Sequence, residues 1–388
     1  MTALQKSAAS AALLAGAVAA MSFLTYGRSA LARFVSERWA EAVGAVTAAE
    51  LRFGAAGDIG ARTARLGALS ERRIEDLRHP VQTLIGAHDD GLPDSAAGLF
   101  ALERALHQPL YLVQIYNAWG DGDAHAFPHE LVHAIWAIGS VPLVTWEPWL
   151  SAFTDQDRPA HRREHEGLRD IAAGRYDDYI DAWAAAAAGF GKPIFVRFAH
   201  EMNDGYRYPW GPVKNPDPRS FVRAWRRVVS RFRAAGAPNV LWVWSPSISY
   251  GGYLERYPGD DVVDWVATGV LNYGTATRWS HWQSADDVLR AHYAPLSALG
   301  KPMMIAEFGS VARGGDRARW YEQALKRLPA AYPDIKALIF FHVGSDRTVS
   351  GEPLRWSFAD EPAVAGVVQR GLAAWTKRRP EGAKGRRQ

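Results

Sequence analysis

The chain has 388 residues, enough to bury a large core, and its hydrophobic share of 48% and charged share of 22% are those of a folded globular protein. It contains no cysteine, which excludes disulfides, thiolate catalysis and cysteine-ligated zinc. The formal charge of +4 is small for this length, and no basic stripe is evident within the predicted fold, so the sequence argues against binding of nucleic acid.

The N-terminal segment is uncharged between Lys6 and Arg28 and rich in alanine. It fits a secretory signal peptide, cleaved after residues 17–19 or 30–32, and it is also long enough for one membrane span. We therefore interpret residues 1–32 as a signal peptide or signal anchor, and we expect a secreted or periplasmic protein that is either free or anchored to a membrane. Residues 33–79 have a charged helical pattern and are interpreted as a spacer.

From residue 80 onward one pattern recurs, as in "GFGKPIFVRF" and "ALGKPMMIAEF". An amphipathic segment ends at glycine, proline follows, and a short apolar run comes next. Glycine ends a helix in the left-handed conformation, and proline prevents its continuation. The apolar runs are too short for anything but buried strands.

Eight such strands are predicted, and most of them alternate with helical segments. In chain order they are Gln82–Gly86, Leu110–Tyr116, Val141–Trp146, Ile194–Phe198, Val240–Trp244, Val262–Leu271 (in part), Met303–Ala306 and Ala337–Phe341. This order predicts an α/β protein with a single (β/α)8 barrel over residues 80–376, followed by a basic, disordered tail at 377–388. A doubly wound open sheet is the alternative, but no glycine-rich phosphate loop follows the first strand.

Two glutamates directly follow apolar strands, Glu201 after the fourth and Glu307 after the seventh. Those strands face each other across a closed eight-stranded barrel, and chemistry in such barrels lies at the carboxyl ends of the strands. Retaining glycosidases use two carboxyl groups about 5–5.5 Å apart. Either glutamate alone could be a strand-end residue paired with arginine, but the two together, among aromatic residues, favour catalysis.

A metal site receives less support from the sequence. His200 and Glu201 do not make a zinc-protease helix, because Asp204 stands where the second histidine would be required. A scattered site built from His88, His125, His200 or His342 is the alternative. We predict neither a metal nor an organic cofactor.

Three passages resemble glycoside hydrolase family 26. "RFAHEMN" (197–203) is similar to the strand that carries the acid/base of the family, "KPMMIAEFGS" (301–310) to its nucleophile strand, and "LNYG" (271–274) to the strand that supplies a tyrosine near the nucleophile. "VTWEPW", "WVWSP" and "LRWSF" are similar to supporting segments, and the resemblance extends over about residues 80–376.

The resemblance implies that Glu201 is the acid/base and Glu307 the nucleophile. It also implies that Tyr273 donates a hydrogen bond to Glu307 and that Arg197 keeps Glu307 ionised. His200 either orients a carboxyl group or a sugar hydroxyl, or is a rim histidine with no catalytic part.

Sixteen tryptophans exceed ordinary usage, and flat rings suit sugar faces. Trp210 and Trp356 are the favoured sugar platforms because they fall in loops after strands, and Tyr206 and Tyr208 fit the same edge. The remaining candidates, for which core packing competes, are Trp146, Trp244, Trp279 and Trp282. Glu147 is either a third acidic subsite group or a structural partner of an arginine, and the structural role is favoured.

These observations predict a monomeric retaining endo-β-glycanase acting on a polysaccharide such as β-1,4-mannan or mixed-linkage β-glucan. Two alternatives from other classes stay open: a barrel that binds glycans without catalysis, and a membrane-attached subunit of a polysaccharide synthesis or export system.

Overall fold

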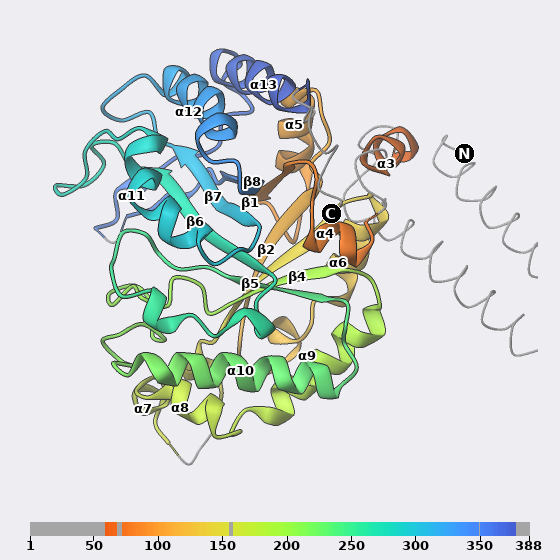
Figure 1. Cartoon of the computed structure of the whole chain (residues 1–388), viewed down its shortest axis with the longest axis vertical. Helices are drawn as coiled ribbons and strands as arrows, with labels where there is room; N and C mark the ends of the chain where they lie inside the picture. Colours follow the sequence, from red (N-terminus) through yellow and green to blue (C-terminus); the bar gives the residue numbers. More distant parts are fainter. Residues whose placement is uncertain (1–58, 68–71, 155–157, 349, 378–388) are drawn as a thin grey trace, which may run out of the picture.

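The computed structural model describes residues 59–67, 72–154, 158–348 and 350–377. Eight parallel strands close into a barrel in which neighbours in sequence are neighbours in space and β8 pairs with β1 (Figure 1). The strands are β1 Leu84–Asp89, β2 Leu112–Ala118, β3 Val141–Glu147, β4 Ile194–Phe198, β5 Val240–Trp244, β6 Trp265–Asn272, β7 Met303–Ser310 and β8 Ile335–His342. The predicted (β/α)8 barrel is confirmed.

Helices surround the barrel. Two short antiparallel strands of two residues each, β9 (Asp346–Arg347) and β10 (Pro353–Leu354), follow β8. The helices are α3 Ile59–Gly67, α4 Ile74–Arg78, α5 Ala97–Leu106, α6 His129–Ala137, α7 Ala160–Glu164, α8 Gly167–Ala172, α9 Asp177–Phe190, α10 Pro218–Ala234, α11 Ala285–Ser297, α12 Arg317–Ala331 and α13 Pro362–Lys377. Within these described residues no helix combines the length and apolar character needed to cross a membrane.

The helices before β4 and β7 end at or near a glycine that is followed by a proline, as predicted. Gly191 follows α9 with a φ of 64°, and Gly300 lies just beyond α11 with a φ of 68°. Each is followed two residues later by a proline, and then by a fully buried strand, β4 or β7. Positive φ favours glycine, so these junctions turn the chain from the helical layer back into the barrel.

The predicted spacer at 33–79 is wrong for the part that the structure describes. Leu66 of α3 and Leu77 of α4 are fully buried in the same cluster as the barrel-interior residues of the strands. Arg62 is also buried and donates hydrogen bonds to Glu103 and to backbone carbonyls of residues 110 and 138. These helices therefore belong to the barrel domain. The predicted signal segment and most of the basic tail lie outside the described residues.

The barrel interior changes from apolar to polar along the strand direction. One buried cluster contains residues from all eight strands, among them Leu112, Leu143 and Phe195. Because side chains alternate between the two faces of a strand, the next inward positions on β2, β3 and β4 are Gln114, Thr145 and Arg197. A hydrogen bond of 2.9 Å from Arg197 Nε to Thr145 Oγ1 confirms that these polar residues meet inside the barrel. The carboxyl end is therefore the polar end.

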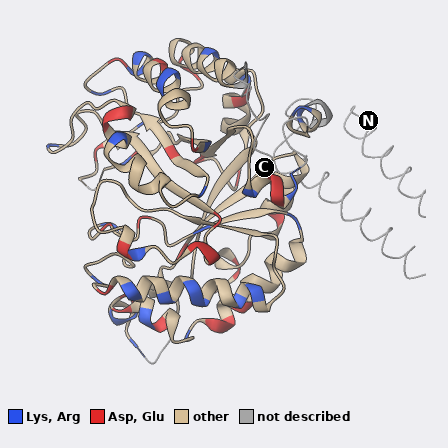
Figure 2. Ribbon diagram, viewed as in Figure 1, with Lys and Arg blue, Asp and Glu red and all other residues tan. Residues whose placement is uncertain are grey.

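Helix α10 on the surface is rich in arginine (Figure 2). Its arginines are matched by acidic residues of neighbouring elements. Arg227 pairs with Asp177, Arg231 with Asp181, and Arg226 binds the carboxylate of Asp261 at 2.7 Å. This pairing leaves little unbalanced positive charge on the helix to attract a phosphate backbone.

Candidate active site

A buried ion pair crosses the polar end of the barrel. Nη2 of Arg197 on β4 lies 2.7 Å from Oε1 of Glu307 on β7. The hydroxyl of Tyr116 on β2 donates to the same oxygen, also at 2.7 Å. Gln114 completes the network, because in the orientation that satisfies its amide it accepts from Arg197 and donates to the carbonyl of Ala306. Three strands that are distant in sequence thus hold one carboxylate.

An irregularity in β7 turns Glu307 into the barrel. Along the β6–β7 ladder, Thr268 pairs with Ile305 and Gly269 with Glu307, so Ala306 is skipped. Ala306 belongs to the interior cluster, and Phe308 belongs to the cluster that faces the helices. With regular alternation Glu307 would point outward with Ile305. The bulge inserts one residue and re-aims the carboxylate inward.

Glu307 is held in its ionised form. Burial by itself disfavours the charge, but Arg197, with a contribution from the hydrogen bond of Tyr116, outweighs it and lowers the pKa of Glu307 to about 2. The carboxylate is therefore negative over the whole physiological pH range.

The second glutamate stands on a strained turn just after β4. Ala199 and Glu201 have positive φ values of 44° and 51°. The amide of Glu201 donates to the carbonyl of Ser245 at 2.7 Å, which ties the turn to the end of β5. Non-glycine residues rarely adopt positive φ, and such strain is concentrated at functional sites.

Glu201 is kept protonated where an ordinary glutamate is ionised. Burial and the negative charge of Glu307 raise the pKa of Glu201 to about 7, with Arg207 and Arg197 partly opposing the shift. The two glutamates therefore share one electrostatic environment with opposite protonation states. Such a pair suits one proton donor and one anionic nucleophile.

This arrangement makes a prediction about stability. Glu201→Gln is expected to raise the free energy of unfolding by about 1–3 kcal/mol at pH 8 relative to wild type, with little difference at pH 4. An unfolded glutamate ionises near pH 4.3, whereas Glu201 in the folded chain ionises at about 7. The stabilising contribution of the protonated carboxyl is therefore lost as pH rises between those two values. Urea denaturation at both pH values measures the difference, and a gain independent of pH would contradict the prediction.

His200 belongs to this turn, and its buried ring packs against Tyr116, Tyr208 and Trp210. Its Nε2 is 2.9 Å from the hydroxyl of Tyr208, and its carbonyl accepts a hydrogen bond from the indole of Trp210 at 2.7 Å. Burial and the charge of Arg197 lower the pKa of His200 well below its usual value, so the ring is neutral. Its Nδ1 faces Oε1 of Glu147, at the end of β3, at 3.8 Å.

The model of the family described as glycosyl hydrolase family 26 matches residues 142–328, which include β3 through β7 and both glutamates. Residues 142–328, close to half of the chain, therefore belong to this family.

Among curated proteins, endoglucanase H of Acetivibrio thermocellus is 32% identical over 260 residues, which cover 65% of this chain and 27% of that protein. A β-1,3-xylanase of a Vibrio species is 32% identical over 137 residues, covering 33% of this chain and 27% of the xylanase. The chain thus spans about a quarter of the length of these relatives.

A solved GH26 β-mannanase of Bacteroides ovatus shares the fold, with a TM-score of 0.52, 16% identity, and coverage of 82% of this chain and 93% of that chain.

Within this family 26 barrel, three of the predicted tryptophan platforms are wrong. Trp146 and Trp356 are 0% exposed and Trp210 is 2% exposed, so none offers a free ring face to a sugar. Trp146 points outward from β3 and packs against Trp119 and Trp183 in the helix-facing layer, because its neighbours Thr145 and Glu147 occupy the inward positions.

Aromatic groups nevertheless lie near the two glutamates. Tyr206, which was predicted, is 87% exposed in the loop after β4, and Tyr250 lies beside it with ring centroids 6.0 Å apart. Tyr250 and the half-buried Trp149 were missed by the sequence analysis. The signal for Trp149 was its position at the end of "VTWEPW", just past the strand.

The hydrogen bond expected from Tyr273 to Glu307 is also wrong for the described structure. Tyr273 is half-buried and packs edge-on against Trp356, with ring centroids 5.0 Å apart. Tyr116 makes the bond instead. It was overlooked because β2 shows two tyrosines and an asparagine near its ends, and only the barrel geometry decides which of them points inward.

The histidines that could have formed a scattered metal site have separate partners. His88 bonds to the carbonyl of Gln114, His125 to that of Ala118, and His342 to Asp89 at 2.8 Å. Among the residues that the structure describes, no group of three or more acidic or histidine side chains is arranged to hold a metal ion.

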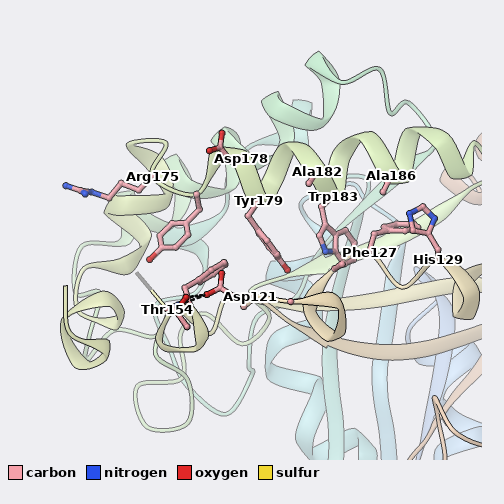
Figure 3. Close-up of a pocket in the computed structure, with 15 residues that line it drawn as sticks. Asp121, Phe127, His129, Thr154, Arg175, Asp178, Tyr179, Ala182, Trp183 and Ala186 are labelled. Atoms are coloured by element: carbon pink, nitrogen blue, oxygen red, sulfur yellow. Dashed lines mark hydrogen bonds between the residues drawn. The ribbon is translucent and has the colours of Figure 1, made fainter. Parts of the chain in front are cut away.

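A separate pocket lies outside the barrel, between α9 and the loop after β2 (Figure 3). Tyr179 and Trp183 project into it from α9, opposite Asp121 and Thr154, which are hydrogen-bonded to each other. Neither Glu201 nor Glu307 lines this pocket. It is therefore distinct from the site at the barrel end.

Proposed function

We propose that this protein is a retaining endo-β-glycanase that hydrolyses a β-linked polysaccharide by double displacement. The observation that carries the proposal is the pair of glutamates whose pKa values are driven in opposite directions, to about 7 for Glu201 and about 2 for Glu307. Membership of glycosyl hydrolase family 26 supports it.

In the first step Glu201 transfers its proton to the glycosidic oxygen as the bond from that oxygen to the anomeric carbon breaks. Glu307 attacks the anomeric carbon and forms a covalent glycosyl ester. Both hydrogen bonds to Glu307 reach Oε1, so Oε2 is the oxygen that attacks. In the second step the carboxylate of Glu201 removes a proton from water, the water oxygen attacks the anomeric carbon, and Glu307 is released.

Arg197 and Tyr116 position the nucleophile and set its charge. Arg197 is buried and is itself held by Thr145, so its guanidinium does not need to reorganise during the reaction. When Glu307 becomes an ester its negative charge disappears, and the deprotonated Glu201 becomes the remaining anion near Arg197. The cation therefore favours both the ionised nucleophile and the ionised base.

The proposed substrate is β-1,4-mannan or mixed-linkage β-glucan. The relatives of this chain include a protein called an endoglucanase, and a solved β-mannanase shares its fold, which supports a β-linked glycan. Arg197, His200 and Tyr273 would line the reactive sugar, and Tyr206 would contact the chain at the rim. Discrimination between glucose and mannose depends on a few hydrogen bonds to one hydroxyl.

The test is incubation of the full chain with mannan, lichenan, xylan and curdlan, with product stereochemistry followed by NMR. Short oligosaccharides that retain the β configuration when first released are expected from at least one polysaccharide. Inversion at the anomeric carbon would contradict the assigned roles. Binding without hydrolysis would favour the non-catalytic glycan-binding barrel.

We further propose that the protein acts outside the cytoplasm, exported or anchored through residues 1–32. The support is the alanine-rich uncharged segment and the polymeric substrate. Fractionation of cells that express the chain with and without residues 1–32 tests the proposal. Recovery of both forms in the same soluble cytoplasmic fraction would contradict it.

A further inference from the structure

An arginine in the loop after β4 has no counter-ion among the described residues. The side chain of Arg207 is exposed, and within that part of the chain its guanidinium forms neither an ion pair nor a side-chain hydrogen bond. Only electrostatic interactions at longer range act on it, among them those with Tyr273, Glu201 and Glu307. These residues lie at the ends of β6, β4 and β7, so the cation lies at the carboxyl end of the barrel, beside the proposed catalytic pair.

The loop holds Arg207 in a defined position. The buried carboxylate of Asp204 accepts hydrogen bonds from the backbone N–H groups of Tyr206 at 2.7 Å and of Arg207 at 3.1 Å. The guanidinium carbon lies over the ring of Tyr208, 5.5 Å from its centroid, and the hydroxyl of that ring is bonded to His200. A guanidinium over an aromatic face keeps its N–H groups in its own plane, where they can bind both oxygens of one acid group.

The charges of the catalytic pair do not neutralise this cation. Glu307 is already paired with Arg197 at 2.7 Å. Glu201, whose pKa is about 7, is largely protonated in weakly acidic solution. Arg207 therefore remains as an excess positive charge at the mouth of the site.

Glu147 at the end of β3 does not balance the cation either. Its carboxylate accepts from the indole of Trp149 at 3.1 Å and faces Nδ1 of His200 at 3.8 Å, and it forms no ion pair with an arginine within the described residues. The partnership with an arginine that the sequence favoured for Glu147 is therefore not what the structure shows.

We propose that Arg207 binds a carboxylate carried by the sugar chain, so that the substrate of this site is an acidic β-linked polysaccharide. The inference rests on the proposed function and narrows its substrate class. A guanidinium and a carboxylate make a charge-assisted contact through two parallel hydrogen bonds. Tyr206, next to Arg207 in the chain, is 87% exposed and offers a ring to the same sugar.

The balance of charge favours a carboxylate over a phosphate monoester. A carboxylate carries one negative charge, which one guanidinium balances. A phosphate monoester carries nearly two, and the second would face the anion of Glu307 without compensation. The carboxylate can belong to a uronic acid unit of the chain or to an acidic substituent on a neutral unit.

Binding of a carboxylate also has a consequence for the proton donor. The charge of Arg207 partly opposes the burial that raises the pKa of Glu201 to about 7. A carboxylate on Arg207 cancels that opposing charge, so Glu201 keeps its proton to a higher pH. The fall of kcat at alkaline pH should therefore occur at higher pH with an acidic substrate than with a neutral one.

The test compares acidic and neutral oligosaccharides in the full chain carrying Glu201→Gln. This variant mimics the protonated acid and keeps the ion pair between Glu307 and Arg197, whereas loss of Glu307 would leave Arg197 as a second cation without a partner. One set of probes consists of tetrasaccharides of β-1,4-linked mannuronic acid and glucuronic acid with their uncharged primary amides. The other set is mannotetraose with and without one pyruvyl acetal. Tryptophan fluorescence at pH 6 and low ionic strength measures the dissociation constants.

At least one acidic probe is expected to bind about 10- to 100-fold more tightly than its uncharged counterpart, because it gains hydrogen bonds between charged groups. The set that shows the preference identifies the source of the carboxylate. The preference should shrink as salt is added, because the contact is exposed. Arg207→Gln should abolish it by weakening the acidic probe while the uncharged probe binds as before. Arg207→Lys keeps the charge without the planar fork and should retain part of the preference.

A matched control separates this effect from a general loss of positive charge. Arg370 is an exposed arginine in the second half of α13, and Arg370→Gln should leave every dissociation constant unchanged. Circular dichroism checks that the Arg207 variants keep the fold.

Several outcomes would overturn the inference. These are equal binding of the acidic and uncharged probes, a preference that persists in Arg207→Gln, and failure of every acidic probe to bind. A shift of the alkaline limb in Arg207→Gln without a change in probe selectivity would mean that Arg207 acts only on Glu201, and it would also overturn the inference. Each of these outcomes is compatible with hydrolysis of a neutral polysaccharide by the wild-type chain, so they are distinct from failure of the proposed function.

Discussion

Glu307→Ala is expected to lower kcat/KM on the polysaccharide by about 10⁵-fold or more, while glycan binding survives. The carboxylate points into the barrel with its charge secured by Arg197 at 2.7 Å, and in the proposed mechanism it forms the glycosyl ester. Reducing-sugar release under initial-rate conditions measures the loss, and fluorescence titration measures the remaining affinity.

Azide gives this prediction a positive test. Added to Glu307→Ala with an activated aryl β-glycoside, azide can take the place of the missing carboxylate and should yield the α-glycosyl azide. Glu322→Ala is the matched control and should keep wild-type rates, since its side chain is exposed on α12. Undiminished turnover in Glu307→Ala, or a β-glycosyl azide from it, would remove Glu307 from the nucleophile role.

Glu201→Ala is expected to lower kcat on the polysaccharide by about 10²- to 10⁴-fold and to abolish the alkaline limb of the pH profile. In the wild type kcat/KM should fall as pH rises through about 7, because Glu201 then loses the proton that the leaving group needs. The acid limb should lie well below pH 4, because Glu307 stays ionised down to about 2. Profiles from pH 4 to 9 provide the measurement.

Substrates with different leaving groups distinguish a loss of acid catalysis from other causes of reduced activity in Glu201→Ala. For an aryl glycoside with a strongly acidic phenol, bond cleavage needs little protonation, so the first step should be nearly as fast in Glu201→Ala as in the wild type. Azide should now give the β-glycosyl azide, since Glu307 remains as nucleophile. An equal loss on the aryl glycoside and on the polysaccharide, with the alkaline limb intact, would contradict the assignment.

The barrel was predictable because its signals are local. A glycine and a proline before each of several apolar runs specify where a helix stops and a buried strand starts, and β4 and β5 begin and end at the predicted residues. The end of β7 was missed by four residues, since Glu307, Gly309 and Ser310 are residue types that are uncommon in buried strands. The region 33–79 was expected to be helical but was interpreted as a spacer, because only the docking of Leu66 and Leu77 against the barrel makes α3 and α4 part of the domain.

The candidate site was predicted in part. Glu201, Glu307 and Arg197 were found because each lies on or just after a conspicuous strand, and the Arg197–Glu307 ion pair is present. The prediction of tryptophan platforms for sugars was wrong because a tryptophan within an apolar run can point either to the barrel interior or to the helices. Tyr116 was missed because its partner Glu307 lies on another strand, 191 residues away.

By itself, the sequence determined the order of strands and helices and the two carboxyl groups that end opposite strands, because hydrogen-bonding and hydrophobic periodicity act over a few residues. Only the tertiary structure decided the contacts and the protonation states of those carboxyl groups. Arg197 and Glu307 are 110 residues apart, and their contact depends on closure of the barrel and on one bulge in β7. The protonation of Glu201 and the charge of Glu307 both follow from burial and from neighbours on other strands, which no local stretch of residues specifies.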